Sequence, residues 1–112
     1  MSMIAVFTTV GSLEQAQTIA GGLVERKLSA CVQISRIESV YDWQGEIRNE
    51  TEFRLFAKTL KERYPDVEAA ILDAHPYDLP AIYAMDIEYA YGPYLEWVSL
   101  NSSGEVAGRH SD

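Results

Sequence analysis

The chain has 112 residues, of which 47% are hydrophobic and 23% are charged, and its net charge is −8. This length and composition are typical of one globular domain that buries its own core. The excess of acidic residues argues against a nucleic-acid partner, because such proteins need a basic face to displace phosphate counterions.

The sequence pattern contains neither a membrane helix nor an export signal. No apolar run approaches the ~20 residues of a membrane helix, and the stretch Met3–Phe7 is too short for the apolar part of a signal peptide. The single cysteine, Cys31, cannot form an internal disulfide and is typical of a reducing compartment. We therefore expect a cytoplasmic protein without a membrane partner.

The first predicted elements are a strand and a helix. Residues 3–9 form a short, continuous apolar run of the kind found in a central strand that is buried on both faces. Ser12 and Gln15, three residues apart, form a capping box that predicts the start of a helix. Apolar residues then recur at three- and four-residue spacing, as on one helical face: Leu13, Ala16, Ile19, Ala20, Leu23 and Val24.

A long β-hairpin is expected next. Residues 30–43 have extended character, Gln44-Gly45 is a turn signal, and residues 53–58 alternate on the return. An arm of about 13 residues spans ~43 Å, whereas a domain of this size has a diameter of roughly 35 Å. The tip, with Tyr41 and Trp43, should therefore project beyond the body as an exposed aromatic patch, which marks an interface.

The second half of the chain predicts a helix, a strand and a shorter helix. Residues 60–74 carry apolar side chains at helical spacing, with Pro65 acceptable only in the first turn. His75-Pro76 ends that helix, residues 82–88 form a strand, and Gly92-Pro93 begins the last helix.

This order, β-α-β-β-α-β with a terminal helix, indicates an α+β fold. It is the ferredoxin-like sandwich, with both main helices on one face of a four-stranded antiparallel sheet. We assign residues 1–101 to this domain and residues 102–112 to a flexible C-terminal tail.

Two residues could bind a metal ion. His75 lies in a segment bracketed by Pro76 and Pro80, and it either serves as a ligand or proton carrier or interacts with the free carbonyls at the helix end. Cys31 could bind copper(I) or act as a nucleophile, but a lone cysteine in an apolar strand is more often a small core residue. No second histidine stands near His75, so a metal site needs ligands from distant strands or another subunit.

Four further residues could line a polar cleft, namely Glu52, Lys58, Tyr77 and Asp78. The alternative is a surface ion pair that contributes little to stability. The sequence contains no Gly-x-Gly-x-x-Gly, Walker A, Gly-x-Ser-x-Gly or Cys-x-x-Cys pattern, so the commonest nucleotide, hydrolase and redox motifs are missing. We expect a protein without enzymatic activity.

The chain resembles the CutA family of divalent-cation-tolerance proteins from about Met3 to Leu100. The similar motifs follow one another in order and without a large gap: Leu23–Val32, Tyr41–Ile47, Lys58-Thr59, His75–Pro80 and Tyr94–Trp97. The resemblance implies a homotrimer with a PII-like architecture, in which long hairpins reach across subunits and ligands bind in inter-subunit clefts. We place Tyr41, Trp43 and Trp97 at the oligomer interface.

The resemblance also implies tolerance of copper and other divalent metals. Copper binding in the family is attributed to a cysteine late in the first strand and to paired histidines before the Pro-Tyr. Here these positions hold Thr8 and Ala74, which leaves only His75. Copper or another divalent metal should therefore bind weakly or through other groups such as Cys31, and no cofactor is assigned.

Three functions compete. The first is a non-enzymatic trimer that binds a metal ion, a small anion or another small ligand between subunits. The second is a PII-like signalling or structural assembly module without metal binding. The third is an acylphosphatase-like hydrolase, a weaker hypothesis because its site needs an arginine in the loop after the first strand, and Thr8–Ser12 offers none.

Overall fold

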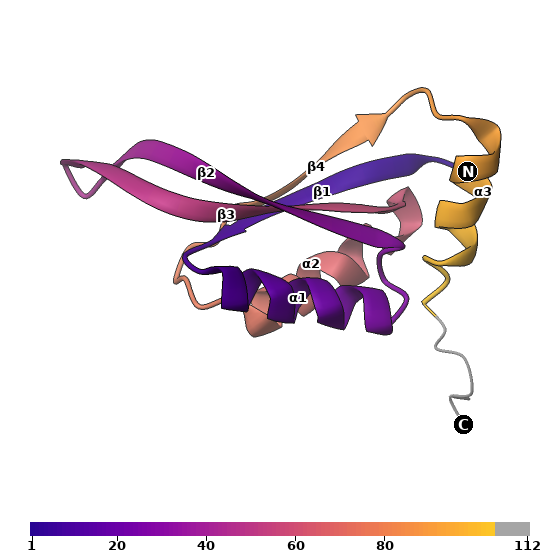
Figure 1. Cartoon of the computed structure of the whole chain (residues 1–112), viewed down its shortest axis with the longest axis horizontal. Coiled ribbons are helices and arrows are strands. Elements are labelled where there is room, and N and C mark those ends of the chain that lie inside the picture. Colours follow the sequence, from indigo (N-terminus) through magenta and orange to yellow (C-terminus); the bar gives the residue numbers. More distant parts are fainter. Residues whose placement is uncertain (105–112) are drawn as a thin grey trace.

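The computed structural model describes residues 1–104, which form a single four-stranded sheet with helices packed on it (Figure 1). The elements in chain order are β1 (Met3–Val10), α1 (Leu13–Glu25), β2 (Cys31–Trp43), β3 (Glu46–Leu60), the 3-10 turn η1 (Lys61–Arg63), α2 (Tyr64–Ala74), β4 (Ile82–Ile87) and α3 (Gly92–Leu100). The strands are antiparallel in the order β2-β3-β1-β4. The predicted ferredoxin-like α+β fold is confirmed.

The two faces of the sheet are covered differently. Helices α1 and α2 lie together on one face, whereas α3 reaches only one end of the molecule (Figure 1). The main core lies between the sheet and the two helices, and its most buried members are Ile4, Val6, Val10, Ala16, Leu23, Leu55, Ala57, Val67 and Ile71. A smaller cluster forms where α3 packs: Met3, Ala30 and Val98, with Ile87, Tyr94 and Leu95 beside them.

Strand β1 is buried on both sides, as predicted for a central strand. Its residues alternate between the helix-covered face and the opposite face, which we call the open face. Phe7 points to the open face, where it stacks on Tyr83 at 5.2 Å between ring centroids and meets Phe56 edge-on at 4.9 Å. At Phe7, side chains of neighbouring strands therefore cover β1 on that face, whereas α3 covers the end of β1 at Met3.

The β2–β3 hairpin protrudes from the body, as predicted (Figure 1). Its register runs without interruption from Cys31↔Lys58 to Trp43↔Glu46. The two turn residues, Gln44 and Gly45, have φ angles of 53° and 84°, and this left-handed conformation is the one that matches the twist of a two-residue hairpin turn. The hairpin makes the molecule 46 Å long against 34 Å and 21 Å in the other directions.

Local signals fix most helix ends where the sequence predicted them, but α2 begins at Tyr64 and not at Leu60, which is the last residue of β3. The Ser12 hydroxyl accepts the backbone N–H of Gln15 at 3.2 Å and caps α1. Pro65 lies in the first turn of α2. That helix ends at Ala74, because the residue before Pro76 adopts an extended conformation. Within residues 1–104, no helix is both long and apolar enough to cross a membrane.

The expected flexible tail needs a correction at its start. Ser102 is only 1% exposed, and the backbone N–H of Gly104 donates to the Lys27 carbonyl at 2.8 Å. The small, polar sequence suggested a solvated segment, but this hydrogen bond to the turn after α1 holds it against the body. The remainder of the expected tail, residues 105–112, lies outside the described residues.

Candidate functional site

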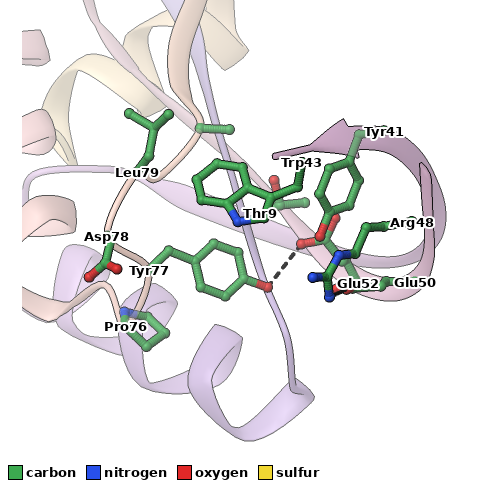
Figure 2. A pocket seen from close by; sticks show the side chains of 11 residues that line it. Thr9, Tyr41, Trp43, Arg48, Glu50, Glu52, Pro76, Tyr77, Asp78 and Leu79 are labelled. Carbon is green, nitrogen blue, oxygen red and sulfur yellow. Dashed lines mark hydrogen bonds and ion pairs between the residues drawn. The ribbon is translucent and has the colours of Figure 1, made fainter. Parts of the chain in front are cut away.

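A cavity of about 530 Å³ lies between the β2–β3 hairpin and the loop that joins α2 to β4 (Figure 2). We call it the hairpin pocket. A volume of this size suits a small organic molecule. Its walls come from β1, from both arms of the hairpin and from the loop: Thr9, Tyr41, Trp43, Arg48, Glu50, Glu52, Pro76, Tyr77, Asp78, Leu79 and Ala81.

The hydrogen bond between Tyr77 and Glu52 joins the two sides of the pocket. The Tyr77 hydroxyl donates to Glu52 Oε2 at 2.9 Å (Figure 2), and the Glu52 residue is only 8% exposed. Burial, and then the neighbouring Glu52 carboxylate, raise the pKa of Tyr77 well above its ordinary value. The phenol therefore remains protonated and keeps its role as a donor at physiological pH.

Gly11 allows Tyr77 to reach this position. A Cβ atom on Gly11 would lie 3.3 Å from the Tyr77 hydroxyl oxygen, which is tighter than an ordinary van der Waals contact. The turn after β1 therefore approaches the phenol as a bare backbone, and the loop can fold over the end of the sheet.

The His75 imidazole is held at both nitrogens. Its Nε2 atom lies 2.9 Å from the carbonyl oxygen of Thr9, which can only accept, and its Nδ1 atom lies 3.2 Å from the backbone N–H of Tyr77, which can only donate. These partners fix the neutral tautomer that carries its proton on Nε2. Burial lowers the pKa of His75, although Thr9 and Glu52 act in the opposite direction.

This geometry bears on the two predictions for His75. Both ring nitrogens already have protein partners, so a metal ion would have to displace one of them. The imidazole instead tethers the loop to β1. This role is similar to the second prediction, in which His75 interacts with free backbone carbonyls. The carbonyl belongs to β1, however, and not to the end of α2.

Cys31 and His75 do not lie together in one protomer. The register aligns Cys31 with Lys58 and Lys58 with Ala5, four residues along β1 from Thr9. Strand geometry then separates the backbones of Cys31 and Thr9 by roughly 16 Å, far beyond a shared metal ion with bonds of about 2 Å.

Within residues 1–104, no three His, Cys, Asp or Glu side chains come together as metal ligands. The donor set of one protomer therefore does not fit a resident copper ion, which prefers thiolate and imidazole ligands. Metal binding by His75 or Cys31 stays a prediction that needs groups from another subunit.

Three of the four predicted cleft residues line the hairpin pocket, namely Glu52, Tyr77 and Asp78. Lys58 is separate from them, because six residues of an extended strand place it roughly 20 Å from Glu52. It donates to the Tyr94 hydroxyl at 3.1 Å and lies 5.8 Å from the centre of the Phe56 ring. The two residues share a face of β3, but Glu52 lies in the middle of the strand and Lys58 near its end.

The predicted interface residues divide between two places. Tyr41 and Trp43 form part of the pocket wall, while Trp97 lies on α3, stacked on Tyr94 at 5.7 Å and partly exposed. The sequence reasoning missed Arg48 and Glu50 as pocket residues. The hairpin register could have found them, because counting back from Gln44-Gly45 pairs Tyr41 with Arg48.

The open face is a second candidate surface. It carries large apolar side chains that none of the described helices covers, among them Tyr83, which is 49% exposed, and Met85, which is 59% exposed. Glu52 and Phe56 are four residues apart on β3, so the hairpin pocket adjoins this face. A broad apolar face of this kind is typical of an interaction surface.

Fold and site together define a class: a ferredoxin-like α+β protein with an extended β2–β3 hairpin and a pocket between that hairpin and the loop before the last strand. Residues 4–101 match the CutA1 family, described as CutA1 divalent ion tolerance protein. The chain belongs to this family.

Individual relatives agree with this assignment. The chain is 40% identical to the divalent-cation tolerance protein CutA of Thermus thermophilus over 98 residues, which is 87% of this chain and 95% of the relative. It is 39% identical to the Archaeoglobus fulgidus CutA over 83% of this chain and 91% of the relative.

Solved structures show the same fold. CutA1 from Oryza sativa matches with a TM-score of 0.88 at 33% identity, covering 91% of this chain and 94% of that one. The A. fulgidus protein, described as a periplasmic divalent cation tolerance protein, matches with a TM-score of 0.87 at 36% identity, covering 89% of this chain and 98% of that one.

Proposed function

We propose that the chain acts as a non-enzymatic homotrimer that binds a small ligand in the hairpin pocket, where the pocket meets a neighbouring subunit. The observation that carries this proposal is the position of the pocket. It opens between a projecting hairpin and a proline-bracketed loop, and it adjoins an apolar sheet face that the described helices leave largely uncovered. A subunit docked on the open face would stand at the rim of the pocket.

The assembly is testable in solution. Light scattering on a sizing column should give three chains per particle at micromolar concentration. The replacement Trp43→Ala should loosen the trimer if the hairpin tip anchors a neighbouring subunit, because large aromatic side chains dominate interface energies. A wild-type chain that stays monomeric at micromolar concentration contradicts the proposal.

Metal binding is a second candidate, because the relatives carry divalent-cation-tolerance names. Such a site would need Cys31 or His75 together with groups of another subunit. Calorimetric titration of the protein with copper, zinc and cadmium separates the two candidates. Binding that is lost in both Cys31→Ser and His75→Gln supports a metal site, and no response to any of the three ions supports a ligand-binding or structural module without metal.

The remaining assignments follow from composition and local structure. The turn between β1 and α1 contains Gly11 and Ser12 and no arginine, which disfavours an acylphosphatase-like site. The charge of −8 disfavours a nucleic-acid partner. A cytoplasmic location stays a prediction from the single cysteine, and the A. fulgidus relative carries a periplasmic description.

A further inference from the structure

Three aromatic rings surround the hairpin pocket. Tyr41 and Trp43 come from the end of β2, and Tyr77 comes from the loop on the opposite side (Figure 2). Each ring is partly exposed, at 37% to 40%. The face of an aromatic ring carries negative charge density and attracts organic cations, most strongly for Trp. Walls of this kind also hold the apolar body of a ligand.

The charges of the pocket leave one carboxylate unbalanced. Arg48 Nη1 lies 3.9 Å from Glu50 Oε1, so these two exposed side chains largely compensate each other. Within residues 1–104, Glu52 forms no such ion pair. Its Oε2 atom accepts the Tyr77 hydroxyl, which leaves Oε1 for a ligand, and its burial reduces the screening by water. The Asp78 carboxylate points away from the other labelled side chains (Figure 2).

The composition of the pocket also limits the alternatives. None of the eleven described residues that line it is histidine or cysteine, so a copper ion would lack its preferred ligands. A bare ion would leave most of the 530 Å³ unfilled. An anion would meet the buried Glu52 carboxylate, and the guanidinium that could attract it is already paired with Glu50.

We propose that the hairpin pocket selects a small organic ammonium ion. The apolar body of the ligand packs between Trp43 and Tyr77, and its ammonium group donates to Oε1 of Glu52. This inference rests on the proposed ligand-binding function and names the chemical class of its ligand.

The test compares three probes with one skeleton: phenethylammonium, 2-phenylethanol and 3-phenylpropanoate. They carry a positive, a neutral and a negative group on the same ring and chain. Titration of the intact oligomer is followed by NMR at the indole N–H of Trp43, assigned with Trp43→Phe. We expect phenethylammonium to bind at least about tenfold more tightly than 2-phenylethanol, the advantage of a cation near aromatic faces and a carboxylate, and 3-phenylpropanoate to bind most weakly.

Two variants should move this preference in opposite directions. Glu52→Gln keeps the shape of the side chain and removes its charge. The contacts of the probe with the Trp43 and Tyr77 rings remain, and the advantage of phenethylammonium over 2-phenylethanol should disappear. Arg48→Gln frees Glu50 and should strengthen phenethylammonium binding about two- to fivefold, as expected when a surface pair is released. Arg48 is an exposed side chain, so this variant keeps the test valid if Glu52→Gln does not fold. Tyr89→Phe, far more exposed and not part of the pocket wall, is the matched control and should change nothing.

The outcomes separate the two proposals. Equal affinity for phenethylammonium and 2-phenylethanol, tighter binding of 3-phenylpropanoate, or a preference that survives Glu52→Gln overturns the selectivity for ammonium ions and leaves the ligand pocket standing. If none of the three probes shifts the Trp43 signal, both the selectivity and the pocket function are wrong. A monomer in light scattering contradicts the trimer alone, because Trp43, Glu52 and Tyr77, on which the probe preference depends, belong to one chain.

Discussion

The helix-covered face and the open face of one sheet are built from the same four strands but have different properties. On the helix-covered face, side chains such as Val6, Val10 and Leu55 are at most 1% exposed and pack against α1 and α2. On the open face, Tyr83 and Met85 stay about half exposed, and the hairpin pocket lies at its end. Side chains along each strand point alternately to the two faces, so the two faces can serve different purposes. The residues on the helix-covered face stabilise the protomer, and those on the open face are available to partners.

The largest effect should come from a charge on the open face. Met85→Lys would place an ammonium group in the proposed trimer contact, where burying an unpaired charge costs several kcal/mol (more than about 3). Light scattering should show a fall from three chains to one, while far-UV circular dichroism stays unchanged. The matched control is Val24→Lys on α1, where the side chain is 42% exposed although the apolar spacing predicted it on the core face, and this variant should remain trimeric. An unaltered Met85→Lys trimer would remove the open face from the assembly.

A cavity on the helix-covered face should have the next largest effect. Leu55 is 1% exposed, so Leu55→Ala should lower the free energy of unfolding by about 3 kcal/mol. Denaturant titration at fixed protein concentration measures it. Leu100→Ala, at an exposed position, should change the free energy by less than about 0.5 kcal/mol. If the two variants behave alike, the helix-covered face is not the main source of stability.

The hydrogen bond across the pocket can be compared with a similar one on a helix. Tyr77→Phe leaves the buried Glu52 without its donor and should cost about 1–2 kcal/mol. Tyr64→Phe removes the 2.8 Å bond to Glu68, whose carboxylate has access to water, and should cost only about 0.5 kcal/mol. Thermal unfolding of the two single variants, and of the double variant that combines Tyr77→Phe with Glu52→Gln, measures these losses of stability. The double variant should recover part of the loss, since it no longer leaves a buried charge.

The smallest effect concerns pH. The pKa of His75 is lowered in the folded state, so its contribution to stability is present above the ordinary value of about 6.5 and is lost as the pH falls below it, because the unfolded chain then binds the proton more readily. We expect less than about 1 kcal/mol, since solvent screens a half-exposed group. Melting temperatures at about pH 7.5 and 5.5 should therefore differ more for the wild type than for His75→Asn. A larger difference in the variant would contradict the sign.

Most of the fold could be predicted because its signals are local. The Ser12 cap, the Gln44-Gly45 turn and Pro65 in a first turn each act over three or four residues, and the structure confirms them. The period of apolar residues then decided which face of each element meets the core.

The site was harder to predict, because its contacts join distant parts of the chain. The prolines around Tyr77 indicated a rigid loop, but nothing near Tyr77 in the sequence points to Glu52 as its acceptor. The two bonds of His75 depend on a carbonyl of β1. Lys58 was expected to line a polar cleft together with Glu52, but six residues of β3 separate the two side chains. The pairing of Gly104 with Lys27 escaped prediction for the same reason.

The position of β1 in the sheet order has a consequence for folding kinetics. This strand is made first but lies between β3 and β4, where Met3 pairs with Leu60 on one side and with Ile87 on the other. The β2–β3 hairpin, closed by a two-residue turn, can form alone within about 10 μs. Strand β1 pairs with the distant β3 along one edge, and its other edge stays unpaired until β4 is available; such long-range pairing is slow. Completion of the sheet around β1, and not formation of the long hairpin, should therefore limit the folding rate.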